Sequence, residues 1–301
     1  MAQQNEQVKK PVPASVKRKT ANRNKALMRA ALQVLFFVTM PGAFVAGFNG
    51  IKYIFRTMGT GSVLEINSFA MVLIGLGGFT LLFGRFFCGY VCSFGALGDL
   101  VYWLSGLFQK KVLKKRKQIS LPKQALPVLQ KLKYLNLAFI VLMTAAGRME
   151  SLHGTSPWDV FSRFTALKLP SADYLPGIIC LILILIGMAV QSRFFCQFLC
   201  PLGAFFAVLP ILPFAMLHRD APNCLKGCSA CKNTCPVGLK LETDGFRNGE
   251  CISCGKCAGV CPKNNLQYPA AALFKNDIIY VLFRAAVFFG LGVWLGLCRF
   301  F

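Results

Sequence analysis

The chain has 301 residues, of which 55% are hydrophobic and only 15% are charged, and its formal net charge is +23. This composition is too apolar for a soluble domain of this length and is typical of an integral membrane protein. We find no recognisable nucleic-acid-binding motif, so membrane topology and contact with anionic lipid explain the positive charge better than a nucleic-acid partner does.

The N-terminal segment, residues 1–28, is polar and strongly basic. It contains no short apolar run followed by a small-residue cleavage site, so the sequence predicts no cleavable signal peptide. We expect this segment to form a disordered cytosolic tail.

Five apolar stretches follow the tail, and we interpret each of them as a membrane span. They cover residues 31–55, 69–84, 134–147, 174–190 and 278–297. Several are shorter than the roughly 20 residues that a span needs, but the second and fourth run into Phe-Phe-Cys, where the helix can lengthen. Pro41-Gly42 inside the first stretch predicts a kink.

Basic residues in the short loops predict the orientation, because loops rich in lysine and arginine stay in the cytoplasm. The tail and the loop over residues 109–133 are strongly basic, whereas the loop from Glu150 to Asp173 is nearly balanced. The sequence therefore predicts a multi-pass protein of the bacterial or archaeal inner (cytoplasmic) membrane. Its N-terminus and the segment after the fourth span lie in the cytosol, and the odd number of spans places the C-terminus outside.

An internal repeat contains four of the cysteines. Residues 85–96, Arg-Phe-Phe-Cys-Gly-Tyr-Val-Cys-Ser-Phe-Gly-Ala, recur at residues 193–204 as Arg-Phe-Phe-Cys-Gln-Phe-Leu-Cys-Pro-Leu-Gly-Ala. Each copy lies at the cytosolic end of a span and follows a two-span hairpin. The repeat therefore predicts a membrane part made of two hairpins, over residues 29–108 and 134–217.

Each copy of the repeat holds a C-x3-C pair, Cys88 with Cys92 and Cys196 with Cys200. Residues i and i+4 are neighbours on a helix surface, so both thiols of a pair should face one side. If the two repeats pack about a pseudo-twofold axis, the four thiols come together and could hold an iron centre or an iron–sulfur cluster near the inner membrane face. Two alternatives stay open, a redox-active thiol pair and buried small residues without a chemical role.

The segment over residues 218–268 contains eight cysteines in two groups of four, each ending in Cys-Pro. The second group matches the C-x2-C-x2-C-x3-C-P pattern of bacterial two-cluster ferredoxins, in which the last cysteine of each group binds the other cluster. We therefore predict two [4Fe–4S] clusters. The predicted ligands of the first are Cys224, Cys228, Cys231 and Cys261, and those of the second are Cys235, Cys251, Cys254 and Cys257.

Other uses of these cysteines fit the pattern less well. Two tetrahedral zinc sites also need eight thiolates, but the spacing and the prolines do not favour them. Disulfides need an oxidising compartment, and the predicted topology puts the segment in the cytosol. The first group departs from the ferredoxin pattern, with three residues rather than two between Cys224 and Cys228. We expect no haem, because the two histidines, His153 and His218, lie outside the spans.

The predicted fold is mainly α-helical. It is a polytopic membrane helix bundle of two hairpin repeats plus a C-terminal span over residues 274–301, with a small cytosolic ferredoxin-like α+β module for the two clusters. This combination of the membrane repeat with paired cysteine quartets resembles the membrane polyferredoxins of the NapH/NosR/YccM/CcoG-like group, over roughly residues 30–268.

The resemblance implies transfer of electrons from a cytosolic or quinol donor toward a partner reductase or a maturation pathway on the outer side. It implies membrane lipid and redox proteins as partners but names neither donor nor acceptor. Clusters at the inner face alone do not explain how electrons cross about 30 Å of hydrocarbon, so a partner or a bound quinone is needed.

Two other classes of function stay open. A metal-reducing or cofactor-assembly enzyme would use the four membrane thiols as its substrate site. An iron–sulfur redox-sensing regulator would report oxygen or iron status without passing electrons to a partner. We favour an electron-carrier subunit of an oxidoreductase system over an enzyme with its own substrate.

Overall fold

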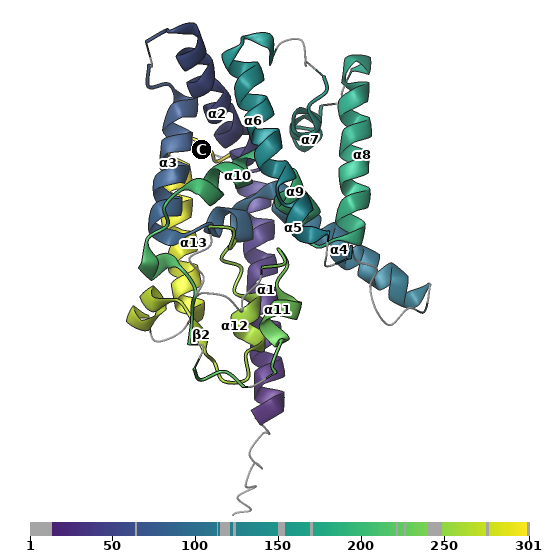
Figure 1. Cartoon of the computed structure of the whole chain (residues 1–301), viewed down its shortest axis with the longest axis vertical. Helices are drawn as coiled ribbons and strands as arrows, with labels where there is room; N and C mark the ends of the chain where they lie inside the picture. The colour runs from purple at the N-terminus through teal and green to yellow at the C-terminus, as the bar shows by residue number, and fades with distance from the viewer. Residues whose placement is uncertain are drawn as a thin grey trace, which may run out of the picture.

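The computed structural model describes residues 14–63, 65–112, 114, 121–122, 125–149, 154–168, 171–220, 222–225, 227–239, 249–274 and 277–299. The chain is mainly α-helical, with one two-stranded sheet among the described residues (Figure 1).

Two sets of helices, one around each copy of the repeat, follow one another along the chain. The first set is α1 (Ala14–Thr39), α2 (Ala43–Thr60), α3 (Ser68–Phe83), the π-helical turn η1 (Phe87–Val91) and α4 (Ser93–Lys111). The second set is α5 (Leu126–Leu129) with α6 (Leu132–Ala145), then α7 (Pro157–Thr165), α8 (Leu175–Val190), α9 (Phe194–Phe198) and α10 (Pro201–Val208). The second set differs from the predicted two-span hairpin, because α7 forms between α6 and α8.

The C-terminal part contains β1 (His218–Arg219), α11 (Ala230–Thr234), α12 (Lys256–Val260), β2 (Leu266–Gln267) and α13 (Asp277–Trp294). Short 3₁₀ helices complete the described elements: η3 (Ala172–Tyr174), η4 (Pro213–Ala215) and η5 (Pro269–Leu273). The two strands pair antiparallel, with Arg219 opposite Leu266. This pairing brings together the two ends of the cysteine-rich segment.

Three helical stretches are long and apolar enough to cross a membrane: Leu126–Ala145, Ala172–Val190 and Asp277–Trp294. Helices α1 and α2 pass the same test only as a pair bent by 64°, and α3 is a shorter apolar helix. Among the described residues there are therefore three candidate spans, or four if the bent pair is one span, against the five that the sequence predicts.

The bend between α1 and α2 falls at Pro41-Gly42, so the predicted kink is confirmed. The predicted lengthening of the second and fourth spans through Phe-Phe-Cys is wrong. Gly84 follows α3 with a φ of 70°, and Arg193 precedes α9 with a φ of 56°. A residue with a positive φ interrupts a right-handed helix, so each span ends before its cysteine pair.

The prediction of a disordered tail is wrong for residues 14–28, because α1 begins at Ala14. Lys25 in this part forms an ion pair with Asp277 at the start of α13, with 2.8 Å between Nζ and Oδ2. This ion pair connects α1 at Lys25 to the start of α13. Residues 1–13 lie outside the described residues.

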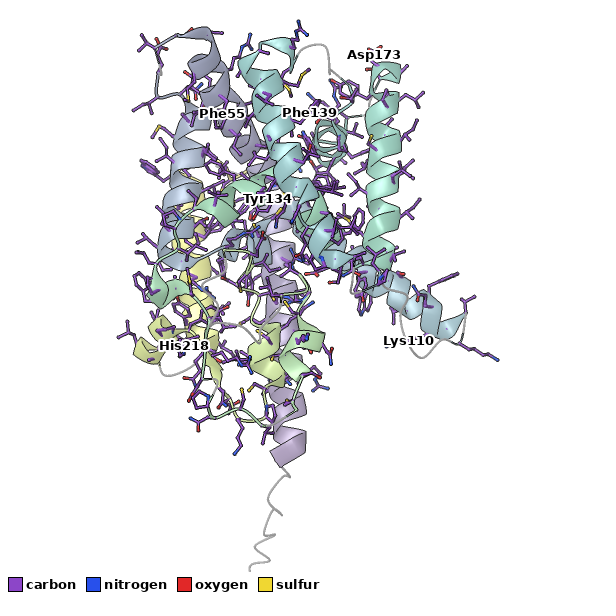
Figure 2. All side chains as sticks on the ribbon, viewed as in Figure 1. Phe55, Lys110, Tyr134, Phe139, Asp173 and His218 are labelled. Carbon is purple, nitrogen blue, oxygen red and sulfur yellow. The ribbon has the colours of Figure 1, made fainter. Side chains whose placement is uncertain are left out.

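Figure 1 shows α2, α3, α6 and α8 in the upper half of the molecule, while α1 extends to the lower end, where it contacts α12. The C-terminus lies among the upper helices. In Figure 2, Lys110 near the end of α4 and His218 in β1 lie toward the lower end, whereas Asp173 lies at the top. The end of α4, where the basic loop begins, is therefore on the same side of the molecule as the cysteine-rich segment.

An aromatic cluster joins the two sets of helices. The ring of Phe94 lies 5.4 Å from that of Phe44, 4.7 Å from that of Phe195 and 4.4 Å from that of Phe161, measured between centroids. Phe94 comes two residues after Cys92, and Phe195 comes directly before the next pair. Such buried, tilted ring pairs stabilise the fold by packing, and here they fix the positions of both C-x3-C pairs.

Candidate functional site

Four cysteines of the C-terminal segment line one cavity. They are Cys224, Cys228, Cys231 and Cys261. The Arg219 side chain donates a hydrogen bond from Nε to the Sγ of Cys224 at 3.4 Å, and the backbone N–H of Asn265 donates to the Sγ of Cys261 at 3.4 Å. The last cysteine of the second group thus lies with the first three cysteines of the first group.

The other four cysteines line a second, separate cavity. They are Cys235, Cys251, Cys254 and Cys257. Apolar side chains, among them Leu217 and Ile252, complete its wall. Burial raises the pKa of Cys251 to about 12 and also raises the pKa values of Cys235 and Cys257. Burial thus disfavours the free thiolates of these three cysteines, and a bound metal would compensate their negative charge.

The loop around Cys254 turns sharply. Ser253 and Gly255, on either side of it, have φ angles of 52° and 67°. Glycine adopts such angles without steric cost, whereas serine is strained there. This turn directs the cysteines of the loop to one cavity, and the short helix α12 begins directly after it.

The four membrane cysteines occupy equivalent places in the two sets of helices. Cys88 lies in η1 and Cys196 in α9, while Cys92 and Cys200 directly precede α4 and α10. All four are buried, and all lie outside the candidate spans. The expected arrangement on one continuous helix is therefore wrong, because each pair spans the break between a short turn and the next helix.

The structure brings the four thiols of the two repeats close together; we call them the membrane quartet. Burial raises the pKa of Cys92, and the Cys196 and Cys88 thiols raise it further. Burial also raises the pKa of Cys200, with further increases from the other three thiols. Among the described residues, no three His, Cys, Asp or Glu side chains are arranged to hold a single metal ion. The four thiols are thus close enough to influence one another electrostatically, without the arrangement of a single-metal site.

Helix N-termini point at two of these thiols. The backbone N–H of Gly203 donates to the Sγ of Cys200 at 3.1 Å, and Gly95 makes the corresponding hydrogen bond to Cys92. The positive end of a helix dipole stabilises a thiolate. Both α4 and α10 therefore favour negative charge at the quartet.

Two buried arginines connect the repeats reciprocally. Arg193, from the second repeat, donates to the backbone oxygens of Cys88 at 2.6 Å and Gly89 at 3.1 Å, and a Cβ on Gly95 would lie 2.2 Å from its Nη1. Its counterpart in the first repeat, Arg85, packs against the other repeat's glycine: a Cβ on Gly203 would lie 3.1 Å from its Nη2. The repeat thus has pseudo-twofold contacts at its centre.

Carboxylates pair with both arginines. Arg193 Nη2 lies 2.6 Å from Oδ2 of Asp99, and Arg85 Nη1 lies 3.3 Å from Oε2 of Glu250. Glu250 also accepts hydrogen bonds from Lys133 and Tyr134, the latter labelled in Figure 2. In addition, Arg85 Nη2 lies 3.9 Å from the Sγ of Cys88.

The membrane quartet abuts the second cysteine cavity. A Cβ on Gly89, beside Cys88, would lie 2.4 Å from the backbone oxygen of Ile252. The Tyr90 hydroxyl donates to the Cys254 oxygen at 3.4 Å, and Gln197 Nε2 donates to the Pro236 oxygen at 2.6 Å. Both repeats therefore touch the loops that carry the cysteines of the second cavity.

Sequence reasoning missed the charged residues around the quartet. Arg85 and Arg193 carried a usable signal, since each directly precedes Phe-Phe-Cys in both copies of the repeat. The sequence contains no comparable signal for Asp99, Lys133 and Glu250, because their partners lie far away in the sequence. Of the two histidines, His218 lies in β1, and His153 lies outside the described residues.

Comparison with known proteins places the chain among iron–sulfur proteins. Residues 67–115 and 175–212 match the family described as a 4Fe-4S binding domain, and these two stretches contain the two copies of the membrane repeat. No solved structure matches the chain significantly.

Several relatives are similar over most of their length. An uncharacterized protein of Methanocaldococcus jannaschii, MJ0750, is 32% identical over 81% of this chain and 96% of its own length. The putative electron transport protein YccM of Escherichia coli is 27% identical over 78% of this chain and 67% of its own length. The ferredoxin-type protein NapH of Haemophilus influenzae is 24% identical, over 66% of this chain and 68% of its own length. The chain belongs to the NapH/YccM-like family of membrane polyferredoxins.

Proposed function

We propose that this protein is a membrane-anchored electron carrier that passes electrons from a cytosolic or quinol donor toward a partner reductase or a maturation pathway. Its family supports an iron–sulfur electron-transfer role. The observation that carries the finer proposal is the direct contact between the second cysteine cavity and the membrane quartet.

In this proposal the module binds two [4Fe–4S] clusters. The first takes Cys224, Cys228, Cys231 and Cys261, and the second takes Cys235, Cys251, Cys254 and Cys257. Each set lines its own cavity, which is the arrangement that exchanged ligands require. Bound there, the clusters supply one-electron redox chemistry, and the chain's part is to hold them close to each other and to the membrane helices.

We propose that the membrane quartet binds a further iron–sulfur cluster. No three described thiols are arranged to hold one metal ion, which favours a polynuclear cluster over a single iron, for which the thiolates must lie within about 2.3 Å of one metal. Two helix N-termini, and the Arg85 guanidinium 3.9 Å from the Sγ of Cys88, favour negative charge at this place. The thiols are buried, so a substrate metal ion cannot reach them easily, which speaks against a metal-reducing enzyme.

Iron analysis tests the proposal. Anaerobically purified protein should contain about four iron atoms and four acid-labile sulfides for each cluster, hence about twelve of each per chain. The variant Cys196→Ala should lose about four of each and keep the rest, while Cys180→Ala, at an exposed position on α8, should lose none. Iron content of about eight in both wild type and Cys196→Ala would refute the third cluster. Stoichiometric zinc without sulfide would refute all of them.

The proposed orientation places the N-terminus and the ferredoxin module in the cytosol and the C-terminus outside the inner membrane. It rests on the basic loop over residues 109–133, whose first part, at Lys110, lies at the same end of the molecule as His218 (Figure 2). An impermeant thiol reagent applied to intact cells should label Asp173→Cys but not Lys110→Cys. The reverse pattern would invert the orientation.

A further inference from the structure

A partly open cavity of about 280 Å³ lies between α1, α12 and α13. Apolar side chains of two helices form much of its wall, among them Met28 on α1 and Ile278 and Val281 on α13. Tyr90 and Cys254 form its inner boundary, so the cavity reaches the loop that carries the cysteines of the second cluster.

Positive charge dominates the polar part of this cavity. Its charged lining residues are Lys25, Arg29, Lys256, Arg284 and Asp277. The single carboxylate, that of Asp277, is paired with Lys25 at 2.8 Å. Lys256 Nζ lies 4.0 Å from Asp99, a residue outside the lining that already pairs with Arg193. The cavity therefore has more cations than carboxylates to balance them.

Arg284 is the most unusual of these cations, because it is 0% exposed and has no carboxylate partner among the described residues. Its guanidinium lies over the rings of Phe86, Tyr268 and Tyr280, 4.4 to 4.9 Å from their centroids. Nη1 donates to the Phe83 oxygen at 3.2 Å, but Nε and Nη2 have no hydrogen-bond partner. Leaving buried charged donors unsatisfied is costly.

Two further donors of the cavity lining are also buried and unsatisfied. They are Nε of Arg29 and the hydroxyl of Tyr268. Arg284 lies seven residues after Asp277, the first residue of α13, so the helix rise puts it about 10 Å along the helix axis. The cavity thus extends from the first residue of the candidate span α13 to about a third of its length. With the proposed orientation, this end of α13 is the cytosolic end, where basic pockets between membrane helices bind anionic lipid headgroups.

We propose that this cavity binds an anionic phospholipid. The phosphate accepts hydrogen bonds from Arg284, Arg29 and the Tyr268 hydroxyl, and the acyl chains lie along the apolar faces of α1 and α13. A neutral ligand would satisfy the donors but leave the excess positive charge. The bound phosphate also lies next to Tyr90, whose hydroxyl contacts the loop of the second cluster, so lipid binding supports the contact between the module and the membrane helices.

Native mass spectrometry of the full-length, delipidated protein in detergent tests the inference. Phosphatidylglycerol should bind at least about tenfold more tightly than phosphatidylcholine. Arg284→Met should weaken phosphatidylglycerol binding about tenfold, and Arg29→Gln, at the half-buried rim, should weaken it in the same direction if Arg284→Met does not fold. The matched control Arg23→Gln removes an exposed charge of α1 outside the cavity and should leave the affinity unchanged.

Three outcomes would overturn the inference. Equal affinity for the two lipids would show that the positive charge of the cavity does not select an anionic lipid. Displacement of phosphatidylglycerol by inorganic phosphate at comparable concentration would identify a free-phosphate site. Selective displacement by a quinone would identify a redox ligand instead. Because the inference uses the orientation but not the clusters, iron content measured on the same samples separates its failure from failure of the proposed electron carrier.

Discussion

The proposed ferredoxin module and the membrane quartet differ in how far apart along the chain their cysteines lie and in how deeply they are buried. The eight module cysteines fall within residues 224–261, and several are partly exposed. The quartet joins Cys88 to Cys200, and all four of its thiols are buried. A short loop can place cysteines around a cluster by turns alone, whereas the quartet depends on the packing of two distant repeats.

The surroundings of the module cysteines and of the quartet also differ in whether local or remote residues form them. Turns at Ser253 and Gly255 shape the second cavity, and few charged side chains contribute. At the quartet, Arg85 and Arg193 lie between the repeats and bind backbone oxygens and carboxylates of remote segments. Local sequence thus organises the module, and long-range ion pairs organise the quartet.

The largest expected effect comes from removing a module cysteine. Cys257→Ser and Cys235→Ser should each lose the second cluster, about four iron atoms, while Cys231→Ser and Cys261→Ser should each lose the first. EPR spectra of the reduced variants identify the missing cluster, and Cys180→Ser serves as the control. If the Cys231 and Cys235 variants lose the same cluster, the exchange of ligands between the two groups is wrong.

Arg193→Met should affect the quartet without a direct effect on the module. It removes the partner of Asp99 and the donor to two backbone oxygens, and breaking such a buried pair costs about 3–5 kcal/mol. We expect a lower midpoint of chemical denaturation in detergent and loss of the quartet's iron, with the module's EPR signals retained. Arg193→Lys should restore part of the stability, since lysine keeps the charge but not the two-pronged geometry. Unchanged denaturation in Arg193→Met would contradict the proposed role of the arginine.

Gly89→Ala tests the contact between the two regions. The new Cβ would lie 2.4 Å from the Ile252 oxygen, and because both atoms are held by backbone, the loop must move away. We expect a destabilisation of about 1–3 kcal/mol and slower electron transfer into the membrane site in stopped-flow reduction, with iron content preserved. Gly78→Ala is the matched control, because no atom lies within 4 Å of its new Cβ. Equal rates in the two variants would mean that this contact is not on the electron path.

The smallest effect is expected for Tyr90→Phe. It removes one hydrogen bond, of 3.4 Å, from the hydroxyl to the Cys254 oxygen, which is worth about 0.5–1.5 kcal/mol. The second cluster's EPR signal should persist with slightly altered g values, while the first cluster's signal stays the same. A change in the first cluster alone would be inconsistent with the structure.

Much of the site was predictable where the signal is local. The spacing from Cys251 to Cys261 predicts ferredoxin-type ligands because one tight loop needs that spacing, and the cysteines of each predicted set line one cavity. Pro41-Gly42 predicts the kink because proline removes a helical hydrogen bond. The predicted lengthening of the second span beyond Gly84 into Phe86-Phe87 is wrong, since hydropathy does not register the positive φ of Gly84.

The sequence by itself determined the repeat, the cysteine groups and the apolar, basic character of the chain, because these depend only on residues near each other or on composition. Only the tertiary structure decided that Arg85 packs against Gly203 and Arg193 against Gly95, that Glu250 meets Lys133, and that Arg284 lines a cationic cavity. Each of these contacts joins segments that are far apart in the chain and brought together by side-chain packing. Periodicity and spacing report on a helix or a loop alone, whereas such contacts depend on how helices rotate and pack against one another.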